Sequence, residues 1–473
     1  MAHRPTPPQR LQAPVLSSPL PVIAAGLLAS LLIGVLLSKS IGLGVAATLA
    51  LLYAPVVLSD LALGVALWVP LVFVERVPAA GRGPAAVGIM VALAWLATLP
   101  SRRQAVAATV REHIGLAFLF VLLLIWVSVS AIWSIDPSAT VETAAFWWLA
   151  AAIFTIVATS LTERRHLVIV CAAFVVGAVI SVVAGVLPGT PISSDVAGTA
   201  EASRLAGSYG DPNFLAAGLV PAMALTAGLA AVIRQPRWRA VLLASAVVLA
   251  VGLLATGSRG GVVAAAVAGV GALLVARGQR LSILAMFATV VLIGGLWFVA
   301  SSSSSLDRIR DFGTGTGRVD LWTIAIRMGD AQPVNGVGLG GFPEASGKYL
   351  RRPGRLQSGQ LGAKLVLDKP HEAHNTYLQM FAETGIVGLS LLIGVILAAF
   401  RSTWMAARSF ERARDPGFAA LAWSVLIAQI AALIASAFIS NPTDKRTWIL
   451  LALGPALMAL ASKSNERTGL EGV

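Results

Sequence analysis

The chain has 473 residues, of which 57% are hydrophobic and only 12% are charged. About a quarter of the residues of a soluble domain are charged, so this composition excludes an ordinary soluble protein and indicates a chain that lies in a lipid bilayer. The net charge of +13 does not indicate nucleic-acid binding, because membrane proteins collect Lys and Arg in their cytoplasmic loops. Cys171 is the single cysteine, which excludes an intrachain disulfide.

Residues 1–20 are polar and rich in proline, and we interpret them as a cytoplasmic tail followed by a retained first helix. After this tail, apolar stretches approach the roughly 20 residues that a spanning helix needs. They predict an all-α integral membrane protein with about 12–14 transmembrane helices. The candidate spans are 21–38, 41–58, 61–75, 85–99, 114–133, 141–160, 167–187, 214–233, 239–256, 260–276, 281–300, 376–400, 417–440 and 447–462.

The predicted organisation has N-terminal membrane helices at 21–200, a membrane core at 201–462 and a cytoplasmic tail at 463–473. One long loop, 301–373, interrupts the core, and its segment 317–328 mixes apolar and charged residues in a way that suits a short interfacial helix. With both termini inside, the inside segments hold 18 of the 35 basic residues and the short outside loops hold seven. Because Lys and Arg favour the cytoplasmic side, the long loop is predicted to be extracytoplasmic.

Two of the five histidines, His371 and His374, fall on the outer side, where the long loop re-enters the membrane. A histidine there could act as a general base, because its ordinary pKa lies near neutrality. It could equally be a histidine at an interfacial helix start. A zinc pair is a weaker third reading, since no third histidine and no outer cysteine could complete the site.

Several outer arginines lie in glycine-rich surroundings: Arg204, Arg259 between Gly257 and Gly260, and Arg318 after Gly317. Guanidinium groups match phosphate oxygens with two parallel hydrogen bonds, so these residues could hold a diphosphate ester. Contact with lipid headgroups would explain any one of them. No Asp-x-Asp pair is present to bind a divalent metal, so no metal and no cofactor are predicted.

Four segments then occur in order: Thr256–Gly261, Gly317–Trp322, Asn335–Phe342 and His374–Gly385. Together they resemble the O-antigen ligase/O-antigen polymerase family, and the loop from Arg204 to Asn213 is also similar to that family. The resemblance covers about 204–390, and the N-terminal helices match only in hydrophobicity.

The resemblance implies a metal-independent, inverting glycosyltransferase of the cytoplasmic (inner) membrane, with its site on the extracytoplasmic face. The donor would be a glycan on a polyprenyl diphosphate, and the acceptor a glycan, lipid or protein hydroxyl. His374 would activate the acceptor, and Arg259 and Arg318 would hold the diphosphate. The further candidates are substrate contacts at Arg204, Asn213, His371, Asn375 and Tyr377, and structural or orienting roles for Glu383, Gly338 and Gly340.

Two alternatives to a ligase remain open. A polymerase would extend a second lipid-linked glycan, and nothing in the sequence separates it from a ligase. A transporter of lipid-linked glycans would perform no transfer. Transporters place ionisable groups near mid-membrane in repeated halves, whereas here they gather towards one face and no repeat is evident. The sequence therefore favours an enzyme.

Overall fold

The computed structural model describes residues 30–31, 34–35, 38–75, 77, 82–187, 204–275, 318–350 and 372–468. Within these ranges the secondary structure consists of α-helices and two short 3-10 helices. The chain divides into two units, 1–59 and 60–473. The first unit contains α2 (Ile41–Ser59), an apolar helix with Pro55 inside it.

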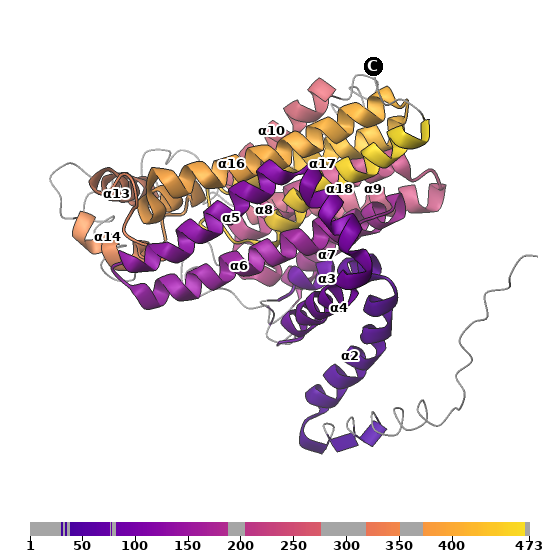
Figure 1. Cartoon of the computed structure of the whole chain (residues 1–473), viewed down its shortest axis with the longest axis horizontal. Helices are drawn as coiled ribbons and strands as arrows, with labels where there is room; N and C mark the ends of the chain where they lie inside the picture. Colours follow the sequence, from indigo (N-terminus) through magenta and orange to yellow (C-terminus); the bar gives the residue numbers. More distant parts are fainter. Residues whose placement is uncertain are drawn as a thin grey trace, which may run out of the picture. The chain divides into compact units, whose positions relative to one another are not determined.

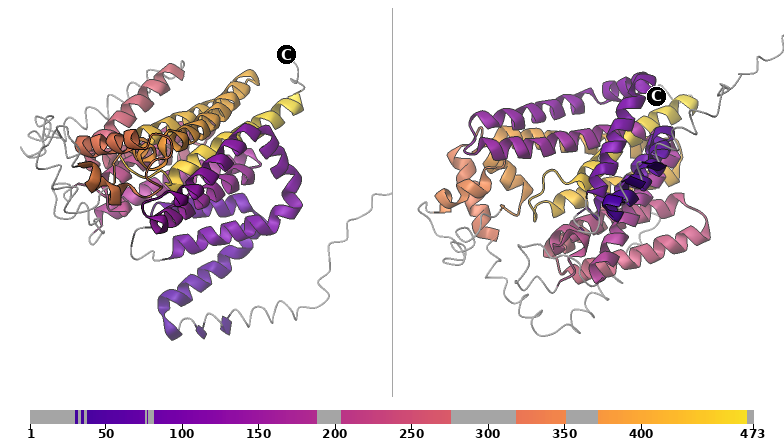
Figure 2. Two further views of the ribbon diagram at one scale, coloured as in Figure 1. Left: turned by 60° about the vertical axis from the view of Figure 1, so that its left-hand side comes forward. Right: turned by 90° about the horizontal axis from the view of Figure 1, so that it is seen from below.

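The second unit is a bundle of helices, shown in two further orientations in Figure 2. Its helices before the long loop are α3 (Leu61–Val72), α4 (Gly83–Glu112), α5 (Ile114–Val129), η2 (Ser130–Ile132), α6 (Pro137–Ser160), α7 (Arg164–Val186), η4 (Gly207–Tyr209), α8 (Pro212–Val232), α9 (Pro236–Thr256) and α10 (Arg259–Val275) (Figure 1). The later helices are α13 (Arg318–Ala331), α14 (Phe342–Leu350), α16 (Thr376–Arg412), α17 (Pro416–Ala435) and α18 (Lys445–Thr468).

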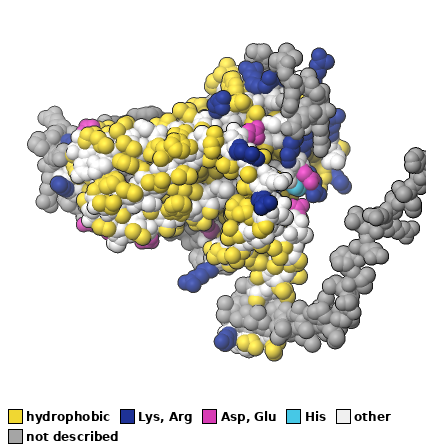
Figure 3. Space-filling model, viewed as in Figure 1, with side chains coloured by type: hydrophobic (Ala, Val, Ile, Leu, Met, Phe, Trp, Pro, Cys, Tyr) yellow, Lys and Arg dark blue, Asp and Glu magenta, His cyan; other side chains and the backbone are white. Residues whose placement is uncertain are grey.

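Eight of the described helices are long and apolar enough to cross a membrane, and three shorter apolar helices accompany them. This confirms the predicted all-α integral membrane fold. The predicted span 281–300 lies outside the described residues, as does most of 21–38. Helices α8 and α17 pack against each other and are largely buried, whereas α4 and α9 expose most of their apolar side chains. The exposed apolar surface over α5, α6 and α16 suits contact with lipid (Figure 3).

Three long helices begin at an Asp-Pro pair: Asp136, Asp211 and Asp415 are the N-caps of α6, α8 and α17. Each carboxylate accepts hydrogen bonds from N–H groups of the first turn, for example 2.7 Å from the Asn213 N–H to Asp211. Proline at the first helical position has no N–H to leave unpaired. At Asp136, the Ser138 hydroxyl and the Ala139 N–H hold the pKa of the carboxyl below its usual value.

Two helices extend beyond the predicted spans. Helix α4 continues to Glu112 and α16 continues to Arg412, although their apolar stretches were expected to stop near 99 and 400. Six arginines that had been expected in loops therefore lie on helices: Arg102, Arg103, Arg111, Arg401, Arg408 and Arg412. Both extensions are rich in Ala and Arg, which favour helix, so the chain stays helical after it has ceased to be apolar.

The two ends of the bundle differ in character. One end carries α13, α14 and the connections that contact them, and we call it the α13 end (Figure 1). The opposite end carries ion pairs such as Arg164 with Asp415 at 2.7 Å and Arg408 with Glu411 at 3.1 Å. The candidate residues of the described chain lie at or near the α13 end, as the next section shows.

Candidate functional site

His374 directly precedes the first turn of α16. The N-cap is Asn375, whose side-chain oxygen accepts the N–H groups of Tyr377 and Leu378, each at 3.0 Å. His374 has a φ of 50°, a left-handed conformation that is uncommon for residues other than glycine but less so for histidine. The residue is partly exposed. Backbone strain of this kind clusters at functional sites, so the surrounding structure must hold His374 firmly.

The predicted substrate contacts next to His374 have partners within the protein. Asn375 caps α16, and the Tyr377 hydroxyl donates to the carbonyl oxygen of Leu433 on α17 at 2.7 Å. Both side chains thereby help to fix the start of α16. His371 lies outside the described residues.

A connection between α17 and α18, residues 436–444, holds the start of α16. The Thr376 N–H donates to the Ser436 carbonyl oxygen at 3.0 Å, and the Thr376 hydroxyl donates to that of Ile439 at 2.8 Å. The Asn375 N–H donates to the Ser440 hydroxyl at 3.3 Å. We call this segment the α17–α18 connection. Through these contacts it lies close to His374, the residue that precedes the α16 N-cap.

Arg259 is the first residue of α10, and the same connection contacts the start of that helix. A Cβ atom at Gly260 would lie 2.7 Å from the Cβ atom of Phe438, so only glycine permits this approach. Gly257, which ends α9, has a φ of 56° and allows the chain to turn sharply into α10. The chain neighbours of Arg259 and His374, Gly260 and Asn375, therefore both contact the α17–α18 connection.

Arg204 and Asn213 lie at the turn that carries Arg259. The Arg204 Nε donates to the Thr256 carbonyl oxygen at 2.5 Å, and its Nη2 lies 3.4 Å from the Asn213 side-chain oxygen. That oxygen also accepts the Ser258 hydroxyl at 2.9 Å. These contacts join the α9–α10 turn to the segment between α7 and α8 and to the start of α8.

Glu383 is buried in α16 and joins that helix to the glycine-rich loop at 335–342. Its carboxylate accepts the Gly340 N–H at 2.9 Å, the Phe342 N–H at 3.3 Å and the Gln379 amide at 3.0 Å. Gly338 has a φ of 100°, and a Cβ atom there would lie 2.5 Å from the Ser134 Cα. The loop thus passes tightly between α16 and the α5–α6 turn.

Arg318 is the first residue of α13, which docks on the first part of α16. The docking is tight, since a Cβ atom at Gly329 would lie 2.2 Å from the Phe381 ring. Leu321, Ile324 and Met328 are buried in the same apolar cluster. Arg318 is consequently the first residue of a helix that packs on α16, the helix that His374 precedes.

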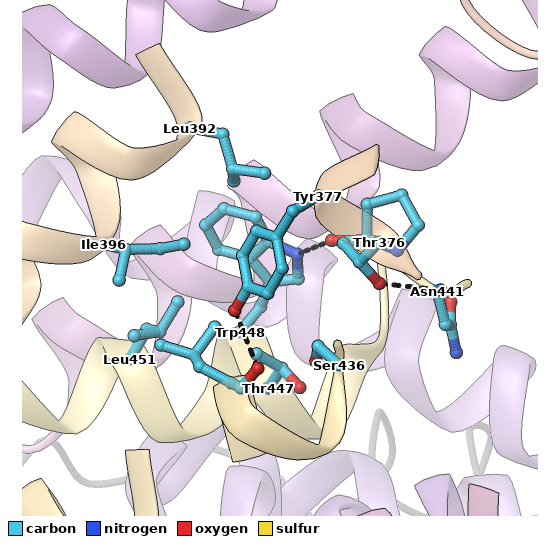
Figure 4. Close-up of a pocket in the computed structure, with 11 residues that line it drawn as sticks. Thr376, Tyr377, Leu392, Ile396, Ser436, Asn441, Thr447, Trp448 and Leu451 are labelled. Atoms are coloured by element: carbon cyan, nitrogen blue, oxygen red, sulfur yellow. Dashed lines mark hydrogen bonds between the residues drawn. The ribbon is translucent and has the colours of Figure 1, made fainter. Parts of the chain in front are cut away.

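Two other features bear on what the site could bind. In the described part of the chain, no group of three His, Cys, Asp or Glu residues is arranged to hold a metal ion. A small cavity lies between α16, α17 and α18 (Figure 4). Of the candidate residues only Tyr377 lines it, and its walls are mostly apolar, as at Leu392 and Leu451.

The α17–α18 connection is the part of this region that the sequence analysis did not identify. In the sequence this segment is marked by the group Asp444-Lys445-Arg446 in an otherwise apolar C-terminal region. Two basic residues there fall in a short outer loop, although Lys and Arg usually favour the cytoplasmic side. Arg446 is 2% exposed and Asp444 is 7% exposed. Buried charges near a membrane are costly and call for a structural or functional reason.

The fold and the site together define a polytopic membrane protein with a histidine and arginines at one end of its helical bundle. The family model of the O-antigen ligase matches residues 244–393, which run from α9 into α16 and include Arg259, Arg318, His374 and Glu383. This part of the chain is therefore similar to the O-antigen ligase family, and the match supports a glycan-processing membrane protein of the O-antigen ligase/polymerase type. None of the curated proteins matches the chain.

Proposed function

We propose that the protein is a glycosyltransferase that moves a glycan from a polyprenyl-diphosphate carrier to an acceptor hydroxyl. The reaction would take place at the outer face of the cytoplasmic membrane. The observation that carries the proposal is the arrangement at the α13 end, where the residues next to Arg259 and His374 pack on one connection. A donor anchored in the bilayer by its lipid can present its diphosphate at that level.

The proposed reaction is a single displacement, which inverts the anomeric centre. The acceptor hydroxyl gives its proton to His374 as its oxygen forms a bond to the anomeric carbon. The bond from that carbon to the diphosphate oxygen breaks, and its electron pair leaves with the polyprenyl diphosphate. Arg259 and Arg318 would stabilise the charge that develops on the leaving group, as fixed donors do at other sites where charge develops.

The decisive experiment is transfer in vitro with purified full-length protein in lipid nanodiscs. A defined polyprenyl-diphosphate-linked glycan serves as donor, and mass spectrometry identifies the product formed with each acceptor. Transfer to a lipid or protein hydroxyl defines a ligase, and growth of a second lipid-linked glycan defines a polymerase. If the protein moves the donor across vesicle membranes and forms no product with any acceptor, it is a transporter and the proposal is wrong.

We expect transfer to continue in EDTA. The proposed neutralisation of the diphosphate by Arg259 and Arg318 needs no divalent cation, because guanidinium groups supply both charge and hydrogen bonds. The measurement is the rate in chelator compared with the rate after magnesium or manganese is added back. Loss of activity in EDTA with recovery on addition of either metal would contradict the metal-independent mechanism.

We expect residues 301–373 to face away from the cytoplasm. A cysteine introduced by Ser358→Cys should react in intact cells with a membrane-impermeant thiol reagent, whereas one introduced by Arg412→Cys at the opposite end should react only after lysis. The native Cys171 is buried and gives a low background. Labelling in the reverse order would show that the orientation is inverted.

A further inference from the structure

The α17–α18 connection is anchored to the bundle by contacts that involve neither Thr376 nor His374. Arg446 and Asp444 form a buried ion pair, with 3.0 Å from Nε to Oδ1 and 2.6 Å from Nη2 to Oδ2. The remaining guanidinium nitrogen, Nη1, donates to the Phe214 carbonyl oxygen on α8 at 2.9 Å. The guanidinium also lies 4.1 Å above the Tyr209 ring. The contacts with Phe214 and Tyr209 tie Arg446 to the region of α8 and η4, and the ion pair with Asp444 joins the connection to Arg446.

Further contacts fix the end of the connection that leads into α18. Lys445 pairs with Glu75, which follows α3. Trp448 donates from its indole nitrogen to the Pro442 carbonyl oxygen at 2.9 Å and stacks on Phe120 of α5. Removal of one partner of a buried ion pair is strongly destabilising because it leaves an unpaired buried charge, so the anchored connection resists displacement.

Thr376 joins this anchored segment to α16. Its buried hydroxyl donates to the Ile439 carbonyl oxygen at 2.8 Å and accepts the Asn441 N–H at 3.2 Å (Figure 4 shows the contact with Asn441). Thr376 is two residues from His374, and the intervening Asn375 is held by Ser440. His374 itself has a left-handed backbone, which the contacts on its C-terminal side help to maintain.

We propose that Thr376 is a positioning residue for His374, acting through the α17–α18 connection and its Asp444–Arg446 anchor. Thr376 does not exchange protons with a substrate in this role. It fixes where the imidazole stands relative to Arg259, whose helix packs on Phe438 of the same connection. This inference rests on the proposed transfer reaction. It adds Thr376 and the α17–α18 connection to the histidine and the arginines that the reaction uses.

The test compares Thr376→Val with Thr376→Ser in full-length protein in nanodiscs. Valine keeps the shape of threonine and loses both hydrogen bonds, whereas serine keeps the hydroxyl. We expect kcat of the valine variant to fall by about 10²-fold, which a misplacement of about 1 Å can cause, with KM for the donor unchanged. The serine variant should recover most of the rate.

A double-mutant comparison separates positioning from general stability. If Thr376 acts through His374, Thr376→Val should cause no further loss in protein that already carries His374→Ala. An unchanged kcat for Thr376→Val, or a further loss in the double mutant, would overturn the proposal. If Thr376→Val does not fold, Ser440→Ala replaces it with the same expectations, because it removes the bond to the Asn375 N–H.

Hydrogen exchange gives a readout that does not depend on transfer. In Thr376→Val, peptides covering 372–378 should exchange faster than in wild type, while peptides from α8 keep their rates. Unchanged exchange at 372–378 overturns the positioning role even if no acceptor is found. Absence of transfer by the wild-type protein, together with faster exchange in the variant, would instead refute the proposed reaction and leave the positioning contact established.

Discussion

Turnover falls by about 10²–10⁴-fold in His374→Ala, while the protein still inserts and binds the donor, if His374 is the general base. The expectation follows from its place at the start of α16, where it is partly exposed and adjoins the N-cap. A base at this position can meet an acceptor that arrives from water and a donor held in the bilayer. The measurement is the transfer rate per molecule of folded, detergent-extracted protein.

The left-handed backbone of His374 requires a second variant, because alanine could act through backbone strain alone. Asparagine tolerates a positive φ better than alanine but cannot serve as a base near neutral pH. We therefore expect His374→Asn to lose as much activity as His374→Ala, and His371→Ala to lose less. Recovery of the rate in His374→Asn would assign the effect to the backbone, and an unchanged rate in both variants would remove His374 from the mechanism.

The membrane helices could be predicted because their signals are local. The Asp-Pro pairs stop one segment and start the next, so the predicted starts of α8 and α17 at 214 and 417 lie close to Pro212 and Pro416. Hydropathy shows which part of a helix is apolar, but it does not show where the helix ends. For this reason α4 and α16 extend beyond the apolar stretches that predicted their spans.

The interior of α16 shows what could not be predicted. The helical geometry is interrupted at Gly385, which has a φ of 65°, and the Ile386 N–H bonds to the Pro333 carbonyl oxygen at 2.8 Å. The Thr384-Gly385 sequence permits such a break, but the partner lies about 50 residues away in the chain and belongs to a loop of irregular structure. Gly340 and Phe342, whose N–H groups donate to Glu383, are 43 and 41 residues away in sequence, so this acceptor role could be read only from the fold.

The candidate site shows the same division between local and distant information. His374 and Arg259 stood out because of their residue type and their glycine or helix-start surroundings. Their common neighbour, the α17–α18 connection, begins more than 60 residues after His374 and contains no motif of catalytic type. The packing of Phe438 beside Gly260 and of Ser440 beside Asn375 relates the two candidates to each other, and this packing is visible only in the structure.

Arg259→Ala and Arg318→Ala should each lower the transfer rate by about 10²–10³-fold, as loss of a donor to a developing negative charge does elsewhere. The two residues begin α10 and α13, and the positive end of each helix dipole adds to the attraction for a diphosphate. Arg412→Ala is the matched control, because Arg412 is exposed at the opposite end of the bundle and should be replaceable without loss of activity.

Lysine variants then distinguish charge from geometry. Lysine keeps the positive charge but cannot place two parallel N–H groups against a phosphate. We therefore expect Arg259→Lys and Arg318→Lys to recover only a small part of the rate, with donor binding measured separately by titration in nanodiscs. If both lysine variants transfer at nearly the wild-type rate, the arginines contribute charge alone. The proposed bidentate binding of the diphosphate is then wrong, although His374 could still serve as the base.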